Sequence, residues 1–169
     1  MYEYFVEEVK NVVDGDTIDV VIDLGFDILF ASRVRLAGID TPESRTTDKA
    51  EKVLGIEAKE YLKKQLKDAK SVVIRTEKMN SSEKYGRILG WVYVNGDSES
   101  VNNKMINDGY AWGYLGETKV KDFEVLKKAR SKSGKWKTFF ILQQIGAVPV
   151  KQQGRLLKKW KEKVLSFKE

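Results

Sequence analysis

Two short runs of this chain place acidic and basic side chains next to apolar segments. The first run reads Asp14-Gly15-Asp16-Thr17, and the second reads Arg35-Leu36-Ala37-Gly38-Ile39-Asp40-Thr41-Pro42-Glu43. An Asp-Gly turn followed by alternating apolar residues is typical of the start of a strand, and loops at strand ends can converge on one cleft. Carboxylates favour hard metal ions, and arginine favours phosphate. The two runs therefore predict a metal site beside a bound phosphate.

The composition restricts the chemistry that such a site can perform. The chain has no cysteine and no histidine. Disulfides, zinc sites of the usual nitrogen and sulfur kind, and nucleophiles or general bases that depend on histidine are therefore excluded. The remaining candidates are carboxylates, Lys, Arg, Tyr and a metal held by oxygen atoms. Such ligands suit Ca²⁺, and ligand type alone leaves Mg²⁺ and Mn²⁺ open beside it.

The elements that must position these residues begin with three strand patterns. Apolar and polar residues alternate over residues 4–9 and again over 17–22, and an apolar segment follows at 26–36. Gly25 lies between the last two segments, where glycine can adopt the positive φ of a tight turn. The patterns predict three consecutive antiparallel strands joined by short turns.

Downstream of residue 43, the patterns predict a helix, two strands and two further helices. They span residues 54–69, 71–76, 88–94, 100–108 and 119–132. Gly55 leaves the start of the first helix open between residues 48 and 56. Five strands with a helix after the third are the order of an oligonucleotide-binding barrel. The predicted fold is therefore an α+β domain, with a five-stranded antiparallel OB-fold barrel and three helices.

Three motifs, in this order, make the chain resemble the staphylococcal nuclease family. They are Asp14-Gly15-Asp16-Thr17, the run from Arg35 to Asp40-Thr41-Pro42-Glu43, and Glu83-Lys84-Tyr85-Gly86-Arg87. Alone, each motif is no more than a turn, an ion pair or a charged hairpin, but their combination favours a nuclease. The resemblance covers about residues 2–136. We therefore expect a nuclease-like domain at 1–136 and a separate C-terminal extension at 137–169.

The resemblance implies a calcium-dependent endonuclease that hydrolyses DNA and RNA, with single strands favoured, and leaves 3′-phosphate ends. Asp16 and Asp40 would bind the metal through their carboxylates. Thr41 would bind it through its backbone carbonyl, and Asp14 would support the metal from outside the ligand set.

The resemblance also assigns the residues that act on the substrate. Glu43 would act on the attacking water, while Arg35 and Arg87 would hold the scissile phosphate. Lys84 and Tyr85 would contact a neighbouring terminal phosphate. A further substrate-contacting tyrosine of the family has no clean match here, and Tyr114 fills that role only with a shift of one residue.

A different class of function stays open. A nuclease-like barrel can bind nucleic acid or protein without cutting it. Modules of that kind usually lose the carboxylates or the arginines, whereas this chain retains both at all the expected positions. The retained residues favour an enzyme.

The C-terminal extension differs from the rest of the chain in charge. Residues 135–169 carry nine Lys or Arg and two Asp or Glu, whereas the net charge of the whole chain is +6. Apolar residues at helical spacing lie among these lysines and predict a basic amphipathic helix. This helix could pack on the barrel or on a second copy of the chain, or it could bind DNA phosphates or an anionic membrane. The pattern does not separate these alternatives.

The N-terminal residues bear on localisation. Residues 1–9 lack the basic start and apolar run of a signal peptide, and no segment is long enough to span a membrane. We therefore expect a cytoplasmic protein. A leader that had already been removed would make it a secreted one.

Overall fold

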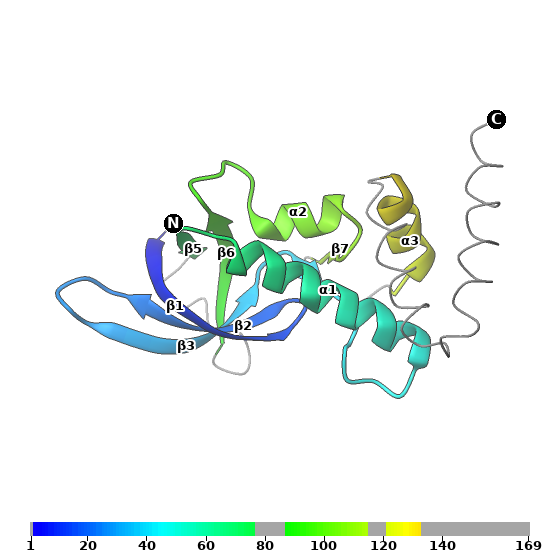
Figure 1. Cartoon of the computed structure of the whole chain (residues 1–169), viewed down its shortest axis with the longest axis horizontal. Coiled ribbons are helices and arrows are strands. Elements are labelled where there is room, and N and C mark those ends of the chain that lie inside the picture. Colours follow the sequence, from blue (N-terminus) through cyan, green and yellow to red (C-terminus); the bar gives the residue numbers. More distant parts are fainter. Residues whose placement is uncertain (1, 77–86, 115–120, 133–169) are drawn as a thin grey trace, which may run out of the picture.

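A computed structural model describes residues 2–76, 87–114 and 121–132 of the chain (Figure 1). The predictions made for Lys84, Tyr85 and residues 137–169 lie outside these residues. None of the helices within the described ranges is long and apolar enough to cross a membrane.

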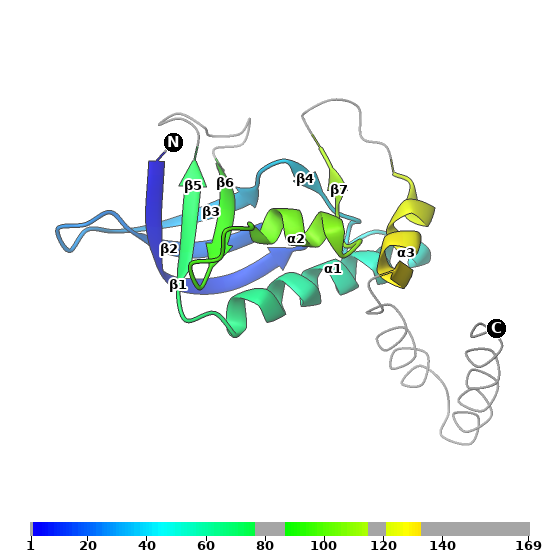
Figure 2. The same ribbon diagram turned by 90° about the horizontal axis from the view of Figure 1, so that it is seen from above.

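A closed five-stranded barrel forms the body of the molecule (Figures 1 and 2). Its strands follow one another around the barrel in the order β1-β2-β3-β6-β5. Their bounds are β1 Tyr2–Asp14, β2 Thr17–Asp23, β3 Leu29–Leu36, β5 Val72–Thr76 and β6 Ile88–Val94. A separate two-stranded sheet pairs β4, Ile39–Asp40, with β7, Trp112–Gly113. The predicted α+β barrel with three helices is thereby confirmed.

The prediction that the barrel is wholly antiparallel is wrong. Strands β3 and β6 run parallel, with Val34 opposite Ile88 and Leu36 opposite Gly90. The other four pairings are antiparallel. An odd number of strands cannot alternate in direction around a closed ring, so a five-stranded barrel must contain at least one parallel pair.

The strands bury alternate side chains in the barrel interior. Ile18, Val20 and Ile22 of β2 are at most 2% exposed, as expected from their period-two pattern. Three register shifts bend β1, so its first residues pair with β5 while the rest pairs with β2. The third strand begins at Leu29 rather than at residue 26, because the segment before it forms the turn.

Helix α1, Lys49–Lys67, packs against β1 and against the second helix (Figure 2). The Asp48 carboxylate caps it by accepting hydrogen bonds from the backbone N–H of Ala50 at 2.8 Å and of Glu51 at 3.2 Å. The helix therefore starts near the early end of its predicted range. Its buried apolar stripe recurs at four-residue spacing, at Leu54, Ala58, Leu62 and Leu66.

Helix α2, Val101–Asn107, lies between β6 and β7 in the chain and supports the backbone that carries the site. Its Asn102 side chain is fully buried, donates to the carbonyl of Ala37 at 2.8 Å, and accepts from the N–H of Val92 at 3.0 Å. These bonds hold the turn after β3 against β6. The turn lies between Arg35 and Asp40, so Asn102 stabilises the backbone on which both side chains depend.

Helix α3, Phe123–Lys132, closes the far end of the molecule beside α1 (Figures 1 and 2). Arg130 is 1% exposed, donates to the carbonyl of Gly109 at 2.6 Å, and forms an ion pair with the buried Glu57 of α1. The helix begins later than predicted, at Phe123. Asp122 accepts from the N–H of Glu124 at 3.0 Å and thus caps it.

Candidate metal and phosphate site

A groove on the outer face of the barrel brings most of the predicted site residues together. Its volume is about 1090 Å³, and we call it the site groove. The predicted residues that line it are Asp14, Asp16, Arg35, Thr41, Glu43, Arg87 and Tyr114. Residues that are up to a hundred positions apart in the chain thus face one space.

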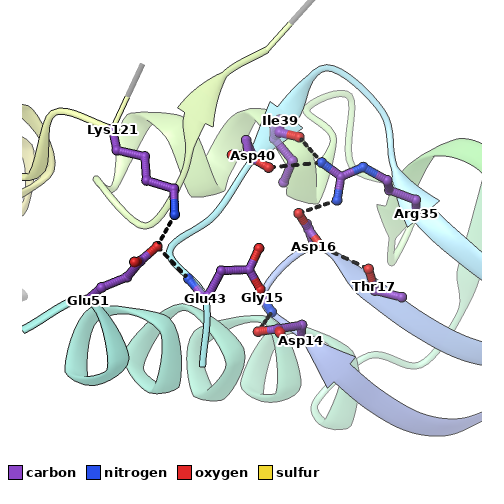
Figure 3. Close-up of polar contacts among 10 residues, drawn as sticks. All are labelled: Asp14, Gly15, Asp16, Thr17, Arg35, Ile39, Asp40, Glu43, Glu51 and Lys121. Atoms are coloured by element: carbon purple, nitrogen blue, oxygen red, sulfur yellow. Dashed lines mark hydrogen bonds and ion pairs between the residues drawn. The ribbon is translucent and has the colours of Figure 1, made fainter. Parts of the chain in front are cut away.

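Arg35 lies between the two predicted metal-binding carboxylates (Figure 3). One end of its guanidinium, Nη1, forms an ion pair with Asp16, and the other, Nη2, donates to Oδ1 of Asp40 at 3.0 Å. Nη2 also approaches the carbonyl oxygen of Ile39 at 3.3 Å. The second Asp16 oxygen accepts from the hydroxyl of Thr17 at 2.8 Å. The hydrogen bond from Arg35 therefore links Asp40 to the residues that line the groove.

Strand register and one tight turn explain why Asp16, Arg35 and Asp40 lie together. Thr17 lies opposite Arg35 in the pairing of β2 with β3, and the Leu36 N–H donates to the Asp16 carbonyl at 2.8 Å. The chain then reverses at Gly38, whose φ of +72° suits glycine. A Cβ at Gly38 would also lie 2.6 Å from the Trp91 ring. The reversal carries Asp40 back towards Arg35.

Asp16, Arg35 and Asp40 form a buried cluster of charges. Asp16, Arg35 and Asp40 are 6%, 8% and 4% exposed. Burial raises the pKa of the Asp16 carboxyl, although the Arg35 charge and the Thr17 hydroxyl oppose the rise. Burial works to lower the pKa of Arg35, but the charges of the two aspartates raise it overall. With both carboxylates ionised, the trio carries an excess of negative charge and attracts a cation.

The donor set fits a hard cation with few protein ligands. Asp16 and Asp40 offer carboxylate oxygens, and the buried Thr41 follows Asp40 directly in the chain. No three acidic, histidine or cysteine side chains in the described ranges converge on one point. A cation here would therefore complete its shell with backbone, water and substrate oxygens, which Ca²⁺ and Mg²⁺ both accept.

Glu43 has an exposed side chain and an anchored backbone. Its N–H approaches Oε1 of Glu51 at 3.3 Å, and the same oxygen accepts from Lys121 Nζ at 2.6 Å (Figure 3). Glu51 belongs to the first turn of α1 and is 6% exposed. A Cβ on Gly55 would lie 2.5 Å from the Glu43 carbonyl carbon. The lack of a side chain at Gly55 therefore lets the Glu43 loop lie directly on the helix.

The sequence analysis missed Glu51 and Lys121. The spacing of Asp48 and Glu51 is that of a capping box, which predicts a helix start and a contact from Glu51 to the backbone N–H of Asp48. In the structure, Glu51 contacts the N–H of Glu43 instead. Lys121 lies 70 residues further along the chain, and no local pattern marks its contact with Glu51.

Several basic residues besides the predicted ones line the site groove. Arg33 donates to Asp19 at 2.7 and 3.0 Å, and Lys10 pairs with Glu8 at 3.1 Å. Arg45 also lines the groove and is exposed. Within the described part of the chain, no carboxylate forms an ion pair with Arg45. It is therefore suited to an incoming anion.

Three other predicted site residues, Arg87, Asp14 and Tyr114, also line the groove. Arg87 immediately precedes β6, whose pairing with β3 brings it to the groove near Arg35. The Asp14 carboxylate accepts from the N–H of Gly15 at 2.9 Å, which shapes the turn before Asp16. Tyr114, for which the sequence match was imperfect, also lines the groove.

Comparison with known proteins gives one family. The family model described as "Staphylococcal nuclease homologue" matches residues 33–138. Protein ParB of Escherichia coli is 34% identical over 135 residues, which cover 76% of this chain and 68% of that protein. The SPbeta prophage-derived endonuclease YokF of Bacillus subtilis is 32% identical over 117 residues, covering 69% of this chain and 37% of YokF.

A second protein of Bacillus subtilis, Endonuclease YhcR, is 29% identical over 137 residues, covering 75% of this chain and 11% of YhcR. The chain thus spans well under half the length of either endonuclease. The match of the family model extends over more than half of the chain and includes Arg35, Asp40, Glu43 and Arg87. This chain belongs to the staphylococcal nuclease family.

Proposed function

We propose that this chain is a metal-dependent nuclease that uses Ca²⁺ to hydrolyse phosphodiester bonds in DNA and RNA and leaves 3′-phosphate ends. The observation that carries the proposal is the position of Arg35 between Asp16 and Asp40, in the groove that Glu43 and Arg87 also line. Membership of the nuclease family supports it. The names of two relatives, both endonucleases, agree with it.

The metal-binding role falls to the acidic side of the groove. Asp16 and Asp40 would hold the ion through their carboxylates and Thr41 through its backbone carbonyl, while Asp14 shapes the turn that supports Asp16. When bound, the ion polarises a phosphoryl oxygen and offsets the charge that accumulates on phosphorus. Ca²⁺ tolerates irregular coordination and several water ligands, which suits a site with two carboxylates.

Glu43 would accept a proton from the attacking water. Its side chain is exposed and lines the groove, whereas Asp16 and Asp40 are buried and bonded to Arg35. Ligation and proton transfer are thus divided between different carboxylates. The bonds and contacts from α1 to the Glu43 backbone would keep the side chain in position.

The two arginines would bind the scissile phosphate. A guanidinium gives two charged hydrogen bonds in a fixed fork, and these strengthen as negative charge develops. In the structure, both ends of the Arg35 guanidinium contact carboxylates, so a bound phosphate would share the guanidinium with Asp16 and Asp40. Loss of one such donor typically costs ~2.7–4 kcal/mol of transition-state stabilisation, which is ~10²–10³ in rate.

Further substrate contacts would flank the scissile bond. Lys84 and Tyr85 would bind a terminal phosphate, and Tyr114 would contact the adjoining nucleotide. Arg45 would hold a phosphate of the same strand, since no described carboxylate competes for it and it lines the groove beside Glu43. All of these proposed contacts are to one strand of the substrate, so we expect single strands to be favoured.

Cleavage of labelled single-stranded DNA in the presence of Ca²⁺, Mg²⁺ or Mn²⁺ tests the proposal. We expect cleavage with Ca²⁺, none after chelation, and 3′-phosphate ends on the fragments. Glu43→Gln should lose at least about a hundredfold in rate, in line with general-base catalysis. Glu60→Gln is the matched control, because Glu60 is an exposed carboxylate of α1 outside the groove.

The same experiment separates the enzyme from a binding module. If no divalent ion supports cleavage but the chain still binds the DNA, the nuclease proposal is wrong and the non-cutting alternative holds. Equal cleavage by wild type and Glu43→Gln would contradict the role given to Glu43.

A further inference from the structure

A second groove lies between β1 and the C-terminal half of α1. Its volume is about 490 Å³, and we call it the lysine groove. Four basic and two acidic side chains line it, so positive charge is in excess: Lys10, Lys63, Lys67, Lys70, Glu7 and Glu8. Figure 2 shows the curved part of β1 lying beside α1, where this groove is formed.

Lys10 lines both the lysine groove and the site groove. The pairing of β1 with β2 explains its position. Val9 lies opposite Val20 and Asn11 lies opposite Asp19, so Lys10 is the extra residue of a β-bulge. The bulge interrupts the alternation of the strand, and Lys10 and Asn11 are both exposed. The two grooves are therefore continuous along the outer side of β1.

The end of a helix explains only part of this positive charge. Lysine is favoured in the last turn of a helix by the partial negative charge of the C-terminus, and Lys67 lies there. Lys70, however, follows the helix, whose cap is Asp68, and Lys10 belongs to β1. Lysines from three separate segments of the chain thus line one groove.

The lysines of this groove are exposed and weakly paired. Lys10 lies 3.1 Å from Glu8, with both side chains more than half exposed, and Lys63 lies 3.9 Å from a glutamate of its own helix. Exposed pairs of this kind contribute ~0–1 kcal/mol, so a phosphate can replace them. Among the described residues, no carboxylate forms an ion pair with Lys67 or Lys70. The groove is therefore suited to an anionic ligand.

We propose that the lysine groove binds the backbone of the same nucleic acid strand that is cleaved in the site groove. The substrate then runs from the site past Lys10 to the C-terminal end of α1. A small anion would occupy one groove only, whereas a chain of phosphates matches positive charge in both grooves and at their junction. This inference rests on the proposed function, because it takes the cleaved strand as the ligand.

The lining of the lysine groove indicates how the strand is bound. No aromatic side chain is among the described residues that line it, so no base can stack there as in many single-strand binding sites. The contacts go to phosphates, which carry no sequence information. The groove therefore strengthens binding to every sequence alike, in DNA and in RNA.

The distance between the grooves decides which substrates benefit. Lys10 precedes Asp14, which lines the site groove, by four residues, or roughly 10–13 Å of strand. The lysines of α1 and Lys70 lie beyond it. A dinucleotide held at the scissile phosphate ends before the lysine groove, whereas a strand of about 16 nucleotides, the upper site size of an OB-fold, reaches it.

Binding of an uncleavable single strand of that length tests the proposal without catalysis. Lys67→Gln combined with Lys70→Gln should reduce the slope of log K against log salt by about 1.4, or about 0.7 for each lost phosphate contact. Over one decade of salt this is a change of about 25-fold in affinity. The matched control combines Lys52→Gln with Lys64→Gln, at exposed lysines of α1 that line neither groove. Its slope should equal that of the wild type.

Cleavage tests whether the groove serves the reaction. The variant at positions 67 and 70 should lose about tenfold or more in kcat/KM on the long strand and nothing on a dinucleotide. Equal losses on the two substrates, or none on either, would overturn the proposal. Circular dichroism checks that the variants fold.

A single cysteine locates the strand directly, because the chain has none of its own. Lys67→Cys, labelled with a photoreactive maleimide, should cross-link to the long strand but not to the dinucleotide. Lys64→Cys, in the same part of α1 but outside the groove, should cross-link far less. Equal cross-linking at both positions would contradict the proposed path.

The results separate this inference from the proposed function. If the wild type cleaves the dinucleotide and the long strand but the slope is unchanged in the variant, the inference is wrong and the proposed function stands. If the wild type cleaves neither substrate but the slope falls as expected, the nuclease proposal is wrong and the lysine groove still binds the strand. A wild type that neither binds nor cleaves overturns both.

Discussion

Gly55→Ala provides a sharp test of how the fold positions Glu43. The new Cβ would lie 2.5 Å from the Glu43 carbonyl carbon and 2.6 Å from the carbonyl oxygens of Pro42 and Glu43. Carbon atoms in contact require about 3.5 Å, so the loop must move by roughly an ångström. All three contacts are with backbone, so no side chain can rotate to make room. The backbone of Glu43 itself must therefore move.

Two opposing effects set the expected stability. Alanine is favoured over glycine inside a helix by ~1 kcal/mol, and the clash costs ~1–3 kcal/mol. The net loss of unfolding free energy should thus be only about 0–2 kcal/mol. A misplacement of about 1 Å can reduce the rate by about a hundredfold. Gly55→Ala should therefore lose far more activity than stability.

The assay measures kcat on single-stranded DNA with Ca²⁺ and thermal unfolding by circular dichroism. Gly113→Ala is the control, because a Cβ there meets no heavy atom within 4 Å. In a Glu43→Gln background, Gly55→Ala should cost little further activity, since both changes act on one group. Unchanged kcat together with a raised unfolding temperature would refute the reasoning, since it would mean that the loop moves away from the helix without disturbing Glu43.

Three further predictions concern the charged residues of the groove. Arg35→Gln leaves two buried carboxylates without their cation, so it should cost about 3–5 kcal/mol without metal. Ca²⁺ should then raise the unfolding temperature of this variant more than that of the wild type, and an equal rise in both would contradict the arrangement. Arg45→Gln should reduce the slope of log K against log salt for an uncleavable single strand by about 0.7, whereas Lys52→Gln, exposed and outside the groove, should not change it. The hydrogen bond from Arg33 lowers the pKa of Asp19 below its usual 3.8, so this pair stabilises the fold at neutral pH and the effect is lost as pH falls through the lowered pKa. The difference in unfolding temperature between wild type and Asp19→Asn should accordingly shrink at strongly acidic pH, and a difference that persists there would contradict this cause.

Local patterns in the sequence predicted most of the elements. The alternation of residues 17–22 matches β2, Thr17–Asp23, and the Asn95-Gly96 turn follows β6 directly. Ser100 caps α2 by accepting from the N–H of Asn103 at 3.2 Å. These features depend on near neighbours in the chain, since periodicity, capping and turn chemistry act over a few residues.

Other features depend on closure of the barrel. The parallel pairing of β3 with β6 and the short strand pair β4 and β7 have no local signature. The alternating pattern of residues 4–9 predicted a short strand, but β1 runs from Tyr2 to Asp14 because bulges let it pair with two neighbours. The sequence pattern of one strand does not show which other strands it pairs with in the closed barrel.

The sequence by itself determined the types of residue available for chemistry: carboxylates, other oxygen ligands and arginines, with no histidine or cysteine. Only the tertiary structure decided that Arg35 bridges Asp16 and Asp40 and that Glu51 and Lys121 anchor Glu43. It also decided that Arg45 lines one groove with Arg35 and Glu43. The physical reason is distance along the chain. A side chain's type is a property of one position, whereas the contacts that give it a role join residues up to 70 positions apart, and these exist only once the barrel and its helices have packed.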